Sequence, residues 1–336
     1  MLHKTKLFNI IENYCNQTVL VVGDIILDEY IRGRTNRLSP EAPVPVLEVD
    51  DYHNIPGGAA NVAANIAVLG GNVILAGVVG DDLHANVIKS ELEKYSIDCS
   101  SIITDKERPT TVKTRLVSKN HYQLARADRE SKKPINKNIE ELILLKVIDN
   151  INSVDIILLS DYAKGVLTES LCRSIIELGI KYNKNIVVDP KGSDYSKYTG
   201  ATLLTPNRLE AEIATELSCG SSAEALAACL FKQISIKNVL VTLGEDGVLL
   251  FDGNIYKKIP AVSTEVFDVT GAGDSLISTI ALSIPASKNN LELSVILGNY
   301  SAGVAVRKKG TTVITPFELK NIIEHEAMDE KLLASS

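Results

Sequence analysis

Short runs of Val, Ile and Leu recur along the chain, with longer helix-like segments between them. The runs lie at residues 18–23, 73–79, 154–160, 186–189, 202–205 and 238–243. Continuous apolar runs of this length are typical of strands covered on both faces. The intervening segments predict helices at 59–69, 83–94, 137–150, 168–183, 207–217, 222–235, 273–283 and 290–308, and a terminal helix from 317 that frays. This alternation predicts a doubly wound α/β fold with a mostly parallel sheet.

Two segments interrupt the alternation. Residues 29–52 and 110–128 both contain stretches in which polar and apolar residues alternate, the second around a turn near Lys119. Such stretches predict half-exposed antiparallel strands. Together they would form a small sheet that projects as a β lid, although two ordinary surface hairpins fit the same pattern. We find no repeat or linker, and we expect a single domain over residues 1–336.

Charge and cysteine content exclude several classes of protein. The chain has 35 Lys and Arg against 42 Asp and Glu, a net charge of −7, so we expect neither nucleic acid nor an anionic membrane as a partner. The uncharged stretch 52–80 contains four Asn and six Gly, which a lipid-facing helix would not accept. Five cysteines without a CxxC pair indicate reduced, mostly buried thiols in the cytoplasm. The sequence has no GxxxxGK[ST] loop, which excludes a P-loop enzyme, and no GxGxxG motif after the first strand, which argues against a dinucleotide-binding enzyme.

The sequence Asp268-Val-Thr-Gly-Ala-Gly-Asp274 carries the strongest chemical signal. Gly271 and Gly273 allow a tight turn into a helix whose first amides converge on one point together with the helix dipole. Asp274 lies in the same turn. A carboxylate beside such an anion site suits phosphoryl transfer, because it accepts the proton of an attacking hydroxyl while the amides stabilise the transferred charge. Spacing alone fits a plain helix N-cap equally well.

Polar residues also stand near the first strand and the helix that follows. Asp24 and Asp28 come after strand 18–23, where ligands bind in open α/β sheets, although an Asp that closes a turn fits as well. A glycine pair, Gly57-Gly58, precedes a helix on which Asn61 and Asn65 share a face suited to hydroxyl groups.

A third motif begins the helix at 207–217. Asn207 and Glu210 are three residues apart after a predicted strand. Their oxygens suit Mg²⁺ and its waters, which hard cations prefer. A capping box explains the same spacing.

Taken together, these motifs resemble the ribokinase/PfkB family of carbohydrate kinases over about residues 18–315. The 268–274 motif is similar to the family's C-terminal signature, and residues 57–61 are similar to its N-terminal signature. The resemblance implies a doubly wound α/β domain with a β lid that often forms a dimer contact. It also implies ATP and Mg²⁺ as cofactors, and transfer of the γ-phosphate to a sugar hydroxyl.

The resemblance also assigns roles by position. Asp274 is then the catalytic base, and the amides of Gly271, Ala272 and Gly273 form the anion site. The implied sugar ligands are Asp28, Gly57, Gly58 and Asn61. The implied residues on the nucleotide side are Lys191, Asn207, Glu210, Thr242, Gly244, Gly247 and Asn299, of which Asn207 and Glu210 serve the metal.

Residues 37–46, 159–165 and 189–192 resemble one branch of the family more closely. That branch phosphorylates D-glycero-β-D-manno-heptose 7-phosphate at the anomeric O1, giving the 1,7-bisphosphate for ADP-heptose and lipopolysaccharide core synthesis. Its kinase often precedes a nucleotidyltransferase with an HxGH-type motif. No such motif occurs in this sequence, so we expect a stand-alone kinase.

A sugar phosphate and ATP are polyanions, so a net-negative protein must supply cations close to them. The candidates are Lys113, Arg115, Arg126, Lys164 and Lys191, of which the motif match favours Arg115 and Lys164. Two alternatives stay open. Another kinase of the family, acting on ribose or 2-keto-3-deoxygluconate, would not need cations at the far end of the cleft. A sugar-binding protein without catalysis would not need Asp274.

Overall fold

The computed structural model describes residues 2–120, 122–262, 266–310 and 312–325. Within these ranges the main sheet has nine strands in the order β13-β12-β11-β10-β9-β8-β1-β4-β5. All pairings from β5 to β11 are parallel, and β12 and β13 add an antiparallel edge. The strands are β1 (Thr18–Gly23), β4 (Asn72–Gly80), β5 (Ile102–Asp105), β8 (Ile156–Ser160), β9 (Asn185–Asp189), β10 (Leu203–Leu204), β11 (Asn238–Thr242), β12 (Val248–Phe251) and β13 (Tyr256–Ile259).

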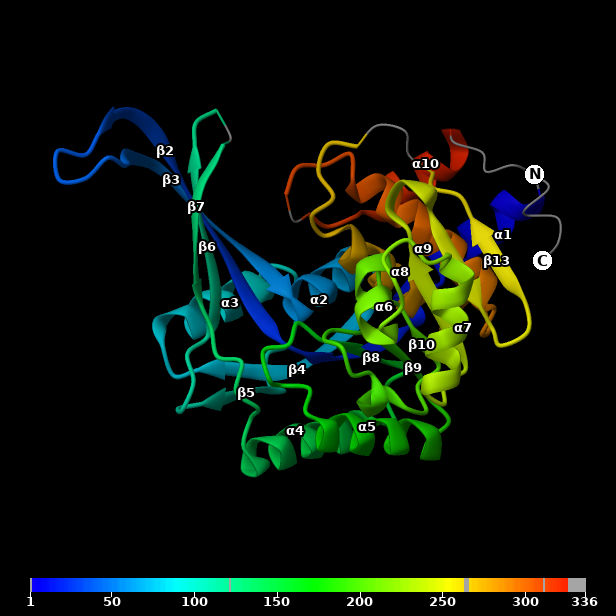
Figure 1. Ribbon diagram of the computed structural model, residues 1–336. Coiled ribbons are helices and arrows are strands. Elements are labelled where there is room, and N and C mark those ends of the chain that lie inside the picture. Colours follow the sequence, from blue (N-terminus) through cyan, green and yellow to red (C-terminus); the bar gives the residue numbers. More distant parts are fainter. Residues whose placement is uncertain (1, 121, 263–265, 311, 326–336) are drawn as a thin grey trace.

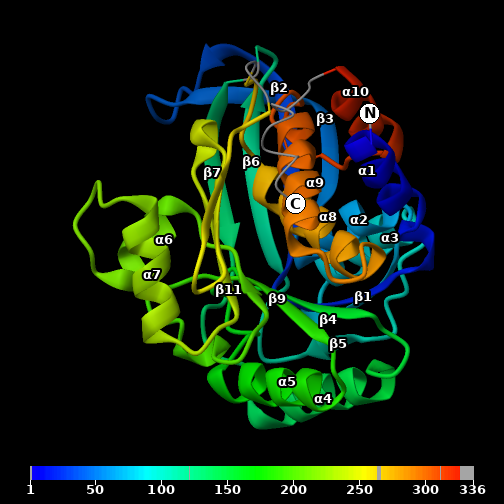
Figure 2. The same cartoon turned by 90° about the vertical axis from the view of Figure 1, so that its right-hand side faces the viewer.

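Helices cover both faces of this sheet, which confirms the doubly wound prediction (Figure 1). Alternate residues of β1 pack in two different hydrophobic cores: Val19 and Val21 lie in one core, and Leu20 and Val22 lie in the other. The first core is covered by α1 (Leu2–Glu12), α2 (Ala59–Val68), α3 (Leu83–Glu93), α8 (Ala272–Ala286), α9 (Leu291–Ala305) and α10 (Pro316–His325). The second is covered by α4 (Lys137–Asn150), α5 (Glu169–Lys181), α6 (Arg208–Thr215) and α7 (Ala223–Gln233). Figure 2 shows α4 and α5 at the bottom and α6 and α7 at the left.

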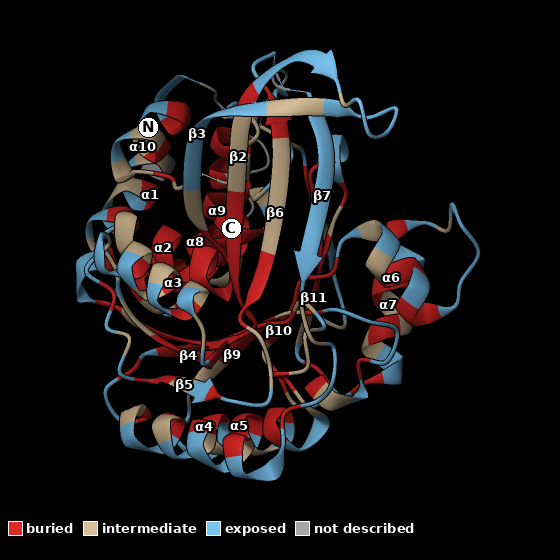
Figure 3. Cartoon of the chain, turned by 90° about the vertical axis from the view of Figure 1, so that its left-hand side faces the viewer, coloured by how far each residue is buried: buried red, intermediate tan, exposed pale blue. Residues whose placement is uncertain are grey.

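A smaller sheet projects from the main one, where the sequence predicts the lid. It contains β2 (Ile25–Leu38), β3 (Pro45–Gly58), β6 (Thr111–Ser118) and β7 (Gln123–Arg129), in the order β3-β2-β6-β7. Two antiparallel hairpins are joined by a parallel pairing of β2 with β6. The base of β2 is buried and its tip is exposed (Figure 3). The parallel pairing places Asp28 opposite Lys113, and this register brings lid residues to the site described below.

The structure departs from the sequence expectations in several places. Helix α1 was not predicted, yet Leu7, Ile10 and Ile11 are buried in the first core. Strands β5, β12 and β13 were not predicted either. The expectation of mostly buried thiols was wrong, because the five cysteines are free but only Cys172 is buried. The expected terminal helix is α10, and its continuation past residue 325 lies outside the described residues. None of the described helices is both long and apolar enough to cross a bilayer.

Candidate active site

Two adjoining cavities lie at the carboxyl edge of the main sheet. The larger, of about 410 Å³, lies between the loop after β11 and helices α8 and α9. The smaller, of about 170 Å³, lies at the ends of β8, β9 and β10. Thr242, Gly273 and Leu276 line both cavities. A ligand could therefore extend from the larger cavity past the start of α8 to Asp274, which lines the smaller one.

The start of α8 forms the turn that the glycines predict. Gly271 is the N-cap residue and has a φ of 80°, a left-handed value that favours glycine. Asp268 fixes the preceding loop by accepting hydrogen bonds from the amides of Thr270 (3.0 Å) and Gly310 (2.9 Å). A Cβ added at Gly273 would have no protein atom within 4 Å, so the backbone there borders open cavity. The predicted Ala272 amide donates to the carbonyl of Val269 (3.3 Å) in this conformation.

Asp274 is buried, with 8% of its surface exposed, and each of its carboxylate oxygens accepts a short hydrogen bond. The Tyr162 hydroxyl donates to Oδ1 (2.5 Å) and the Asn61 amide donates to Oδ2 (2.5 Å). Burial raises the pKa of Asp274, while these two hydrogen bonds oppose the rise. A carboxylate with a raised pKa is a better proton acceptor, which suits a general base.

The lid places Asp28 close to the base. Asp28 is buried and pairs with Arg115, whose Nη1 lies 2.6 Å from Oδ1. Gly57 lies against the same carboxylate, since an added Cβ would lie 2.6 Å from Oδ2. Gly58 caps α2 with a φ of 57°. Asn65 is fully buried and donates to the Asn61 carbonyl (3.0 Å), so of the two asparagines only Asn61 reaches the base.

Four predicted cations gather on the lid side of Asp274. Burial lowers the pKa of Lys113, the nearby Asp28 opposes this, and the positive charges of Lys164, Arg115 and Arg126 lower it further. Lys113 lies 5.7 Å from the centre of the Tyr162 ring, and Lys164 pairs with Glu130 (2.6 Å). The Arg126 side chain on β7 is half exposed and donates two hydrogen bonds to Asp128 (2.8 and 3.0 Å).

The predicted nucleotide residues converge on the larger cavity. Thr242, Gly244, Gly247 and Asn299 all line it, as do the small residues Ala302 and Gly303. Valine side chains supply much of the remaining wall, from Val248, Val262, Val266, Val269 and Val306. The Asn299 amide donates to the carbonyl of Pro260 (2.7 Å), which ties α9 to the loop after β13. An apolar slot of this kind suits a flat heterocyclic base.

Asn207 and Glu210 form the capping box that their spacing also allowed, and both line the smaller cavity. Glu210 additionally pairs with Lys191 (2.5 Å). Among the described residues, no three His, Cys, Asp or Glu side chains are grouped so that they could hold a metal ion. The donor set therefore fits only a cation that keeps most of its waters and shares the phosphates of a ligand, as Mg²⁺ does.

Sequence reasoning assigned no individual role to three residues at this site, although they lie in the segments 159–165 and 189–192 that resemble one branch of the family. Asp161 follows β8, Asp189 ends β9, and Tyr162 donates to the base. The rule that singled out Asp24, a carboxylate at the carboxyl end of a parallel strand, would also have found Asp161 and Asp189. Burial raises the pKa of Asp189 well above its ordinary value, and so do the charges of Asp274 and Glu210.

Comparisons with known proteins agree with this geometry. The sequence profile described as pfkB family carbohydrate kinase matches residues 16–317. The bifunctional protein HldE of Trichlorobacter lovleyi is 42% identical over 318 residues, which are 93% of this chain and 64% of that protein. The chain spans about two thirds of the length of the curated relatives it matches.

Solved structures share the fold at low sequence identity. Phosphofructokinase-2 from Escherichia coli in complex with potassium has a TM-score of 0.74 at 19% identity, covering 92% of this chain and 98% of that one. Ribokinase from Arabidopsis thaliana complexed with ribose and ATP has a TM-score of 0.71 at 18% identity, covering 92% and 99%. These likenesses confirm the ribokinase-like architecture.

Proposed function

We propose a substrate for this chain, which belongs to the pfkB family of carbohydrate kinases and is an ATP-dependent sugar kinase. In the proposal it phosphorylates D-glycero-β-D-manno-heptose 7-phosphate at the anomeric O1. The observation that supports this substrate is a group of cationic side chains on the lid side of Asp274, namely Lys113, Arg115, Arg126 and Lys164. A neutral sugar needs no such group, whereas a second phosphate at the far end of the sugar does. The similarity to proteins named HldE supports the same proposal.

In this proposal Asp274 accepts the proton of the anomeric hydroxyl as the oxygen attacks. The carboxylate lines the smaller cavity and has lone pairs beyond those that Tyr162 and Asn61 occupy. The amides at the start of α8 would stabilise negative charge on the group in transfer, and that of Ala272 would first release its hydrogen bond to the Val269 carbonyl. Asp28, with Gly57 leaving room around it, accepts hydrogen bonds from sugar hydroxyls.

ATP, when bound, supplies the phosphoryl group, and Mg²⁺ neutralises its charge. The larger cavity would hold the base of the nucleotide between Asn299 and the loop at Gly244 and Gly247. Asn207 and Glu210 would hold the waters of Mg²⁺, and Lys191 would contact a phosphate. Positioning and charge stabilisation would then account for most of the rate.

The proposal extends to the assembly and the setting of the protein. Apolar side chains are exposed on the lid, namely Leu38, Val44, Val49, Tyr52, Tyr122 and Leu124, and they would be covered in a homodimer formed through the lid. We place the enzyme in the cytoplasm, where its product would feed ADP-heptose and lipopolysaccharide core synthesis.

The test is ADP release coupled to a second enzyme, with ATP and Mg²⁺. The substrates are the heptose 7-phosphate, the unphosphorylated heptose, ribose, fructose 6-phosphate and 2-keto-3-deoxygluconate. We expect turnover on the heptose 7-phosphate and at most traces on the others. Turnover on another sugar with none on the heptose 7-phosphate would contradict the substrate and keep the sugar kinase.

Substitution of Lys164 tests where the 7-phosphate of the sugar binds. Lys164→Met should raise KM for the heptose 7-phosphate about 10- to 100-fold, because one charge-assisted hydrogen bond is lost, and should leave KM for ATP nearly unchanged. Lys181→Met, on the exposed side of α5, is the matched control. Equal effects of Lys164→Met on both KM values would show that the phosphate binds elsewhere.

A further inference from the structure

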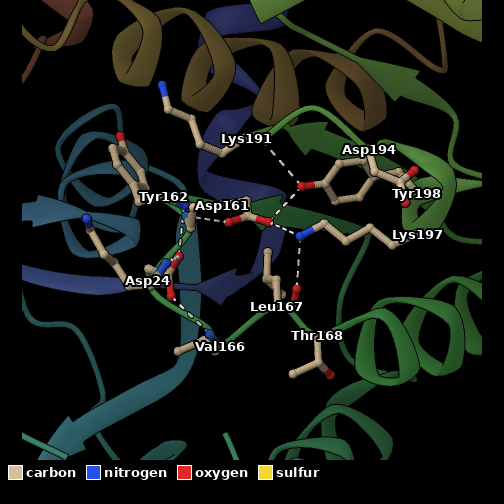
Figure 4. A network of polar contacts seen from close by, with 12 residues as sticks. Asp24, Asp161, Tyr162, Val166, Leu167, Thr168, Lys191, Asp194, Lys197 and Tyr198 are labelled. Atoms are coloured by element: carbon tan, nitrogen blue, oxygen red, sulfur yellow. Dashed lines mark hydrogen bonds and ion pairs between the residues drawn. The ribbon is translucent and has the colours of Figure 1, made fainter. Parts of the chain in front are cut away.

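Two buried carboxylates, those of Asp24 and of Asp161 itself, hold the loop of residues 161–166 that follows β8 (Figure 4). Asp24, 1% exposed, accepts hydrogen bonds from the backbone amides of Tyr162 (2.8 Å), Lys164 (3.1 Å) and Val166 (3.2 Å). Contacts from three alternate amides to one side chain leave this backbone little freedom to move.

Asp161 anchors the start of the same loop. Its Oδ1 accepts the amide of Ala163 (2.7 Å), and its Oδ2 accepts both Lys197 Nζ (2.6 Å) and the Tyr198 hydroxyl (2.7 Å). Lys197 also donates to the carbonyl of Leu167 (3.0 Å), so it clamps both ends of the loop. Lys197, Tyr198 and Leu167 are not among the proposed substrate or nucleotide contacts, whereas Asp161 also lines the smaller cavity. Together these groups fix the position of the backbone at residue 162.

Tyr162 is the side chain that this scaffold aims at the base. Its hydroxyl donates to Asp274 Oδ1 (2.5 Å), and its ring lies under Lys113. Burial raises the pKa of Tyr162 well above its ordinary value, and so do the neighbouring carboxylates of Asp274, Asp189 and Asp28. The phenol is therefore protonated at neutral pH and can donate to the carboxylate.

We propose that Tyr162 is a positioning residue for phosphoryl transfer: with Asn61 it holds the Asp274 carboxylate, one donor on each oxygen, in the orientation that faces the acceptor hydroxyl. This inference rests on the proposed role of Asp274 as the base. A carboxylate held on both sides loses little freedom on the way to the transition state, and rate depends steeply on such positioning. Asn61 comes from α2 and Tyr162 from the loop after β8, so two separate elements set one side chain.

The pH dependence gives the role a distinct signature. The groups that face Asp274 are Tyr162 and Asn61, Asp28 and Lys113 from the lid, and Asp189 at the end of β9. The hydrogen bonds from Tyr162 and Asn61 favour the ionised carboxylate and lower its pKa. Removal of the Tyr162 hydroxyl leaves burial and Asp28 less opposed, so the pKa of Asp274 rises. The acidic limb of kcat/KM must then move to higher pH.

The experiment compares Tyr162→Phe with the wild type in steady-state kinetics at several pH values. We expect kcat to fall about 10- to 100-fold, as for loss of a hydrogen bond to a charged group, with KM for ATP unchanged and the acidic limb shifted to higher pH. Tyr182→Phe, whose ring lies at the end of α5, is the matched control. A Tyr162→Phe enzyme with wild-type kcat and an unmoved limb would overturn the proposal.

A folding control and two further variants separate this inference from its premise. Circular dichroism and thermal melting show whether Tyr162→Phe is folded. If Tyr162→Phe is not folded, Asn61→Ala, which removes the other hydrogen-bond donor to Asp274, tests whether the two donors position the carboxylate. In that variant too, a lower kcat with a shifted limb supports the proposal, and an unchanged limb refutes it. If Asp274→Asn stays active, the proposed base itself is wrong. If Asp274→Asn is inactive while Tyr162→Phe behaves as wild type, only the positioning role fails.

Discussion

Replacing Asp274 by Asn separates the chemistry of this site from its stability. The variant keeps the shape of the side chain and loses the proton acceptor. A positioned general base contributes about 10²- to 10⁴-fold to a rate, so we expect kcat to fall by that factor, or about 3 to 5 kcal/mol of barrier. Binding of ATP, which occupies the other cavity in the proposal, should persist.

The structure also fixes the expected effect on folding. An Asn at 274 has one carbonyl and one amino group, so only one of its two neighbours, Tyr162 and Asn61, finds an acceptor. Leaving a buried donor unpaired costs about 1–3 kcal/mol. Removal of a buried charge offsets part of this cost. We therefore expect a shift in Tm of no more than a few degrees near neutral pH.

The pH dependence of that shift has a definite sign. Burial raises the pKa of Asp274 in the folded chain above the 3.8 of the unfolded chain. The stability that this group contributes is present below pH 3.8 and is lost as the pH rises through its folded pKa. The Asn variant lacks this loss, so its Tm relative to the wild type should improve from pH 4 towards neutral.

The assays are ADP release at saturating substrates, titration calorimetry with ATP, and melting curves at several pH values. Asp149→Asn, an exposed site on α4, controls for the general effect of losing a carboxylate. Retention of more than a tenth of kcat by the Asp274 variant would refute the assignment of the base. A folded variant that no longer bound ATP would refute the separation of the two cavities.

Two other predictions concern positions away from the base. Gly273→Ala should fold normally, because its added Cβ has no protein atom within 4 Å. The added methyl group narrows the junction of the two cavities, so KM for ATP should rise about tenfold or more. An unchanged KM for ATP would contradict the proposed path of the phosphates. Leu7→Ala in α1 should lower the free energy of unfolding by about 2–5 kcal/mol in denaturant titrations while kcat stays at the wild-type value, and a change below 1 kcal/mol would show that α1 is peripheral.

Buried strands and amphipathic helices were the predictable part of the fold. Residues 137–150 were predicted as a helix and form α4 over the same range, because Asn136 caps it and three apolar side chains repeat on one face. β12 was missed because Val248–Phe251 is a short apolar run that looks like many others, and only its pairing with β11 makes it a strand. The parallel pairing of β2 with β6 joins segments about 85 residues apart, which no local pattern reports.

The site was predictable where a motif marks a backbone shape. The turn at the start of α8 requires the left-handed φ of Gly271, and the resemblance assigned the base, Asp274, shortly after it. Tyr162 lies in the segment 159–165 that resembles one branch of the family, but no role was assigned to it, because nothing local distinguishes an aromatic residue in a loop from a packing residue. Its role depends on a hydroxyl meeting Asp274, 112 residues further along the chain.

The way the 161–166 loop is anchored bears on how substrate preference can change during evolution. Asp24 and Asp161 hold the loop through backbone amides, which every residue except proline carries. The path of the chain thus depends little on which side chains stand at 162 and 164. The Tyr162 side chain is tied to the base, so the side chain open to exchange, by drift or by design, is that of residue 164, and the backbone that presents it keeps its course. A different substrate can then be explored at this position without rebuilding the loop, which makes residue 164 an evolvable part of an otherwise constrained site.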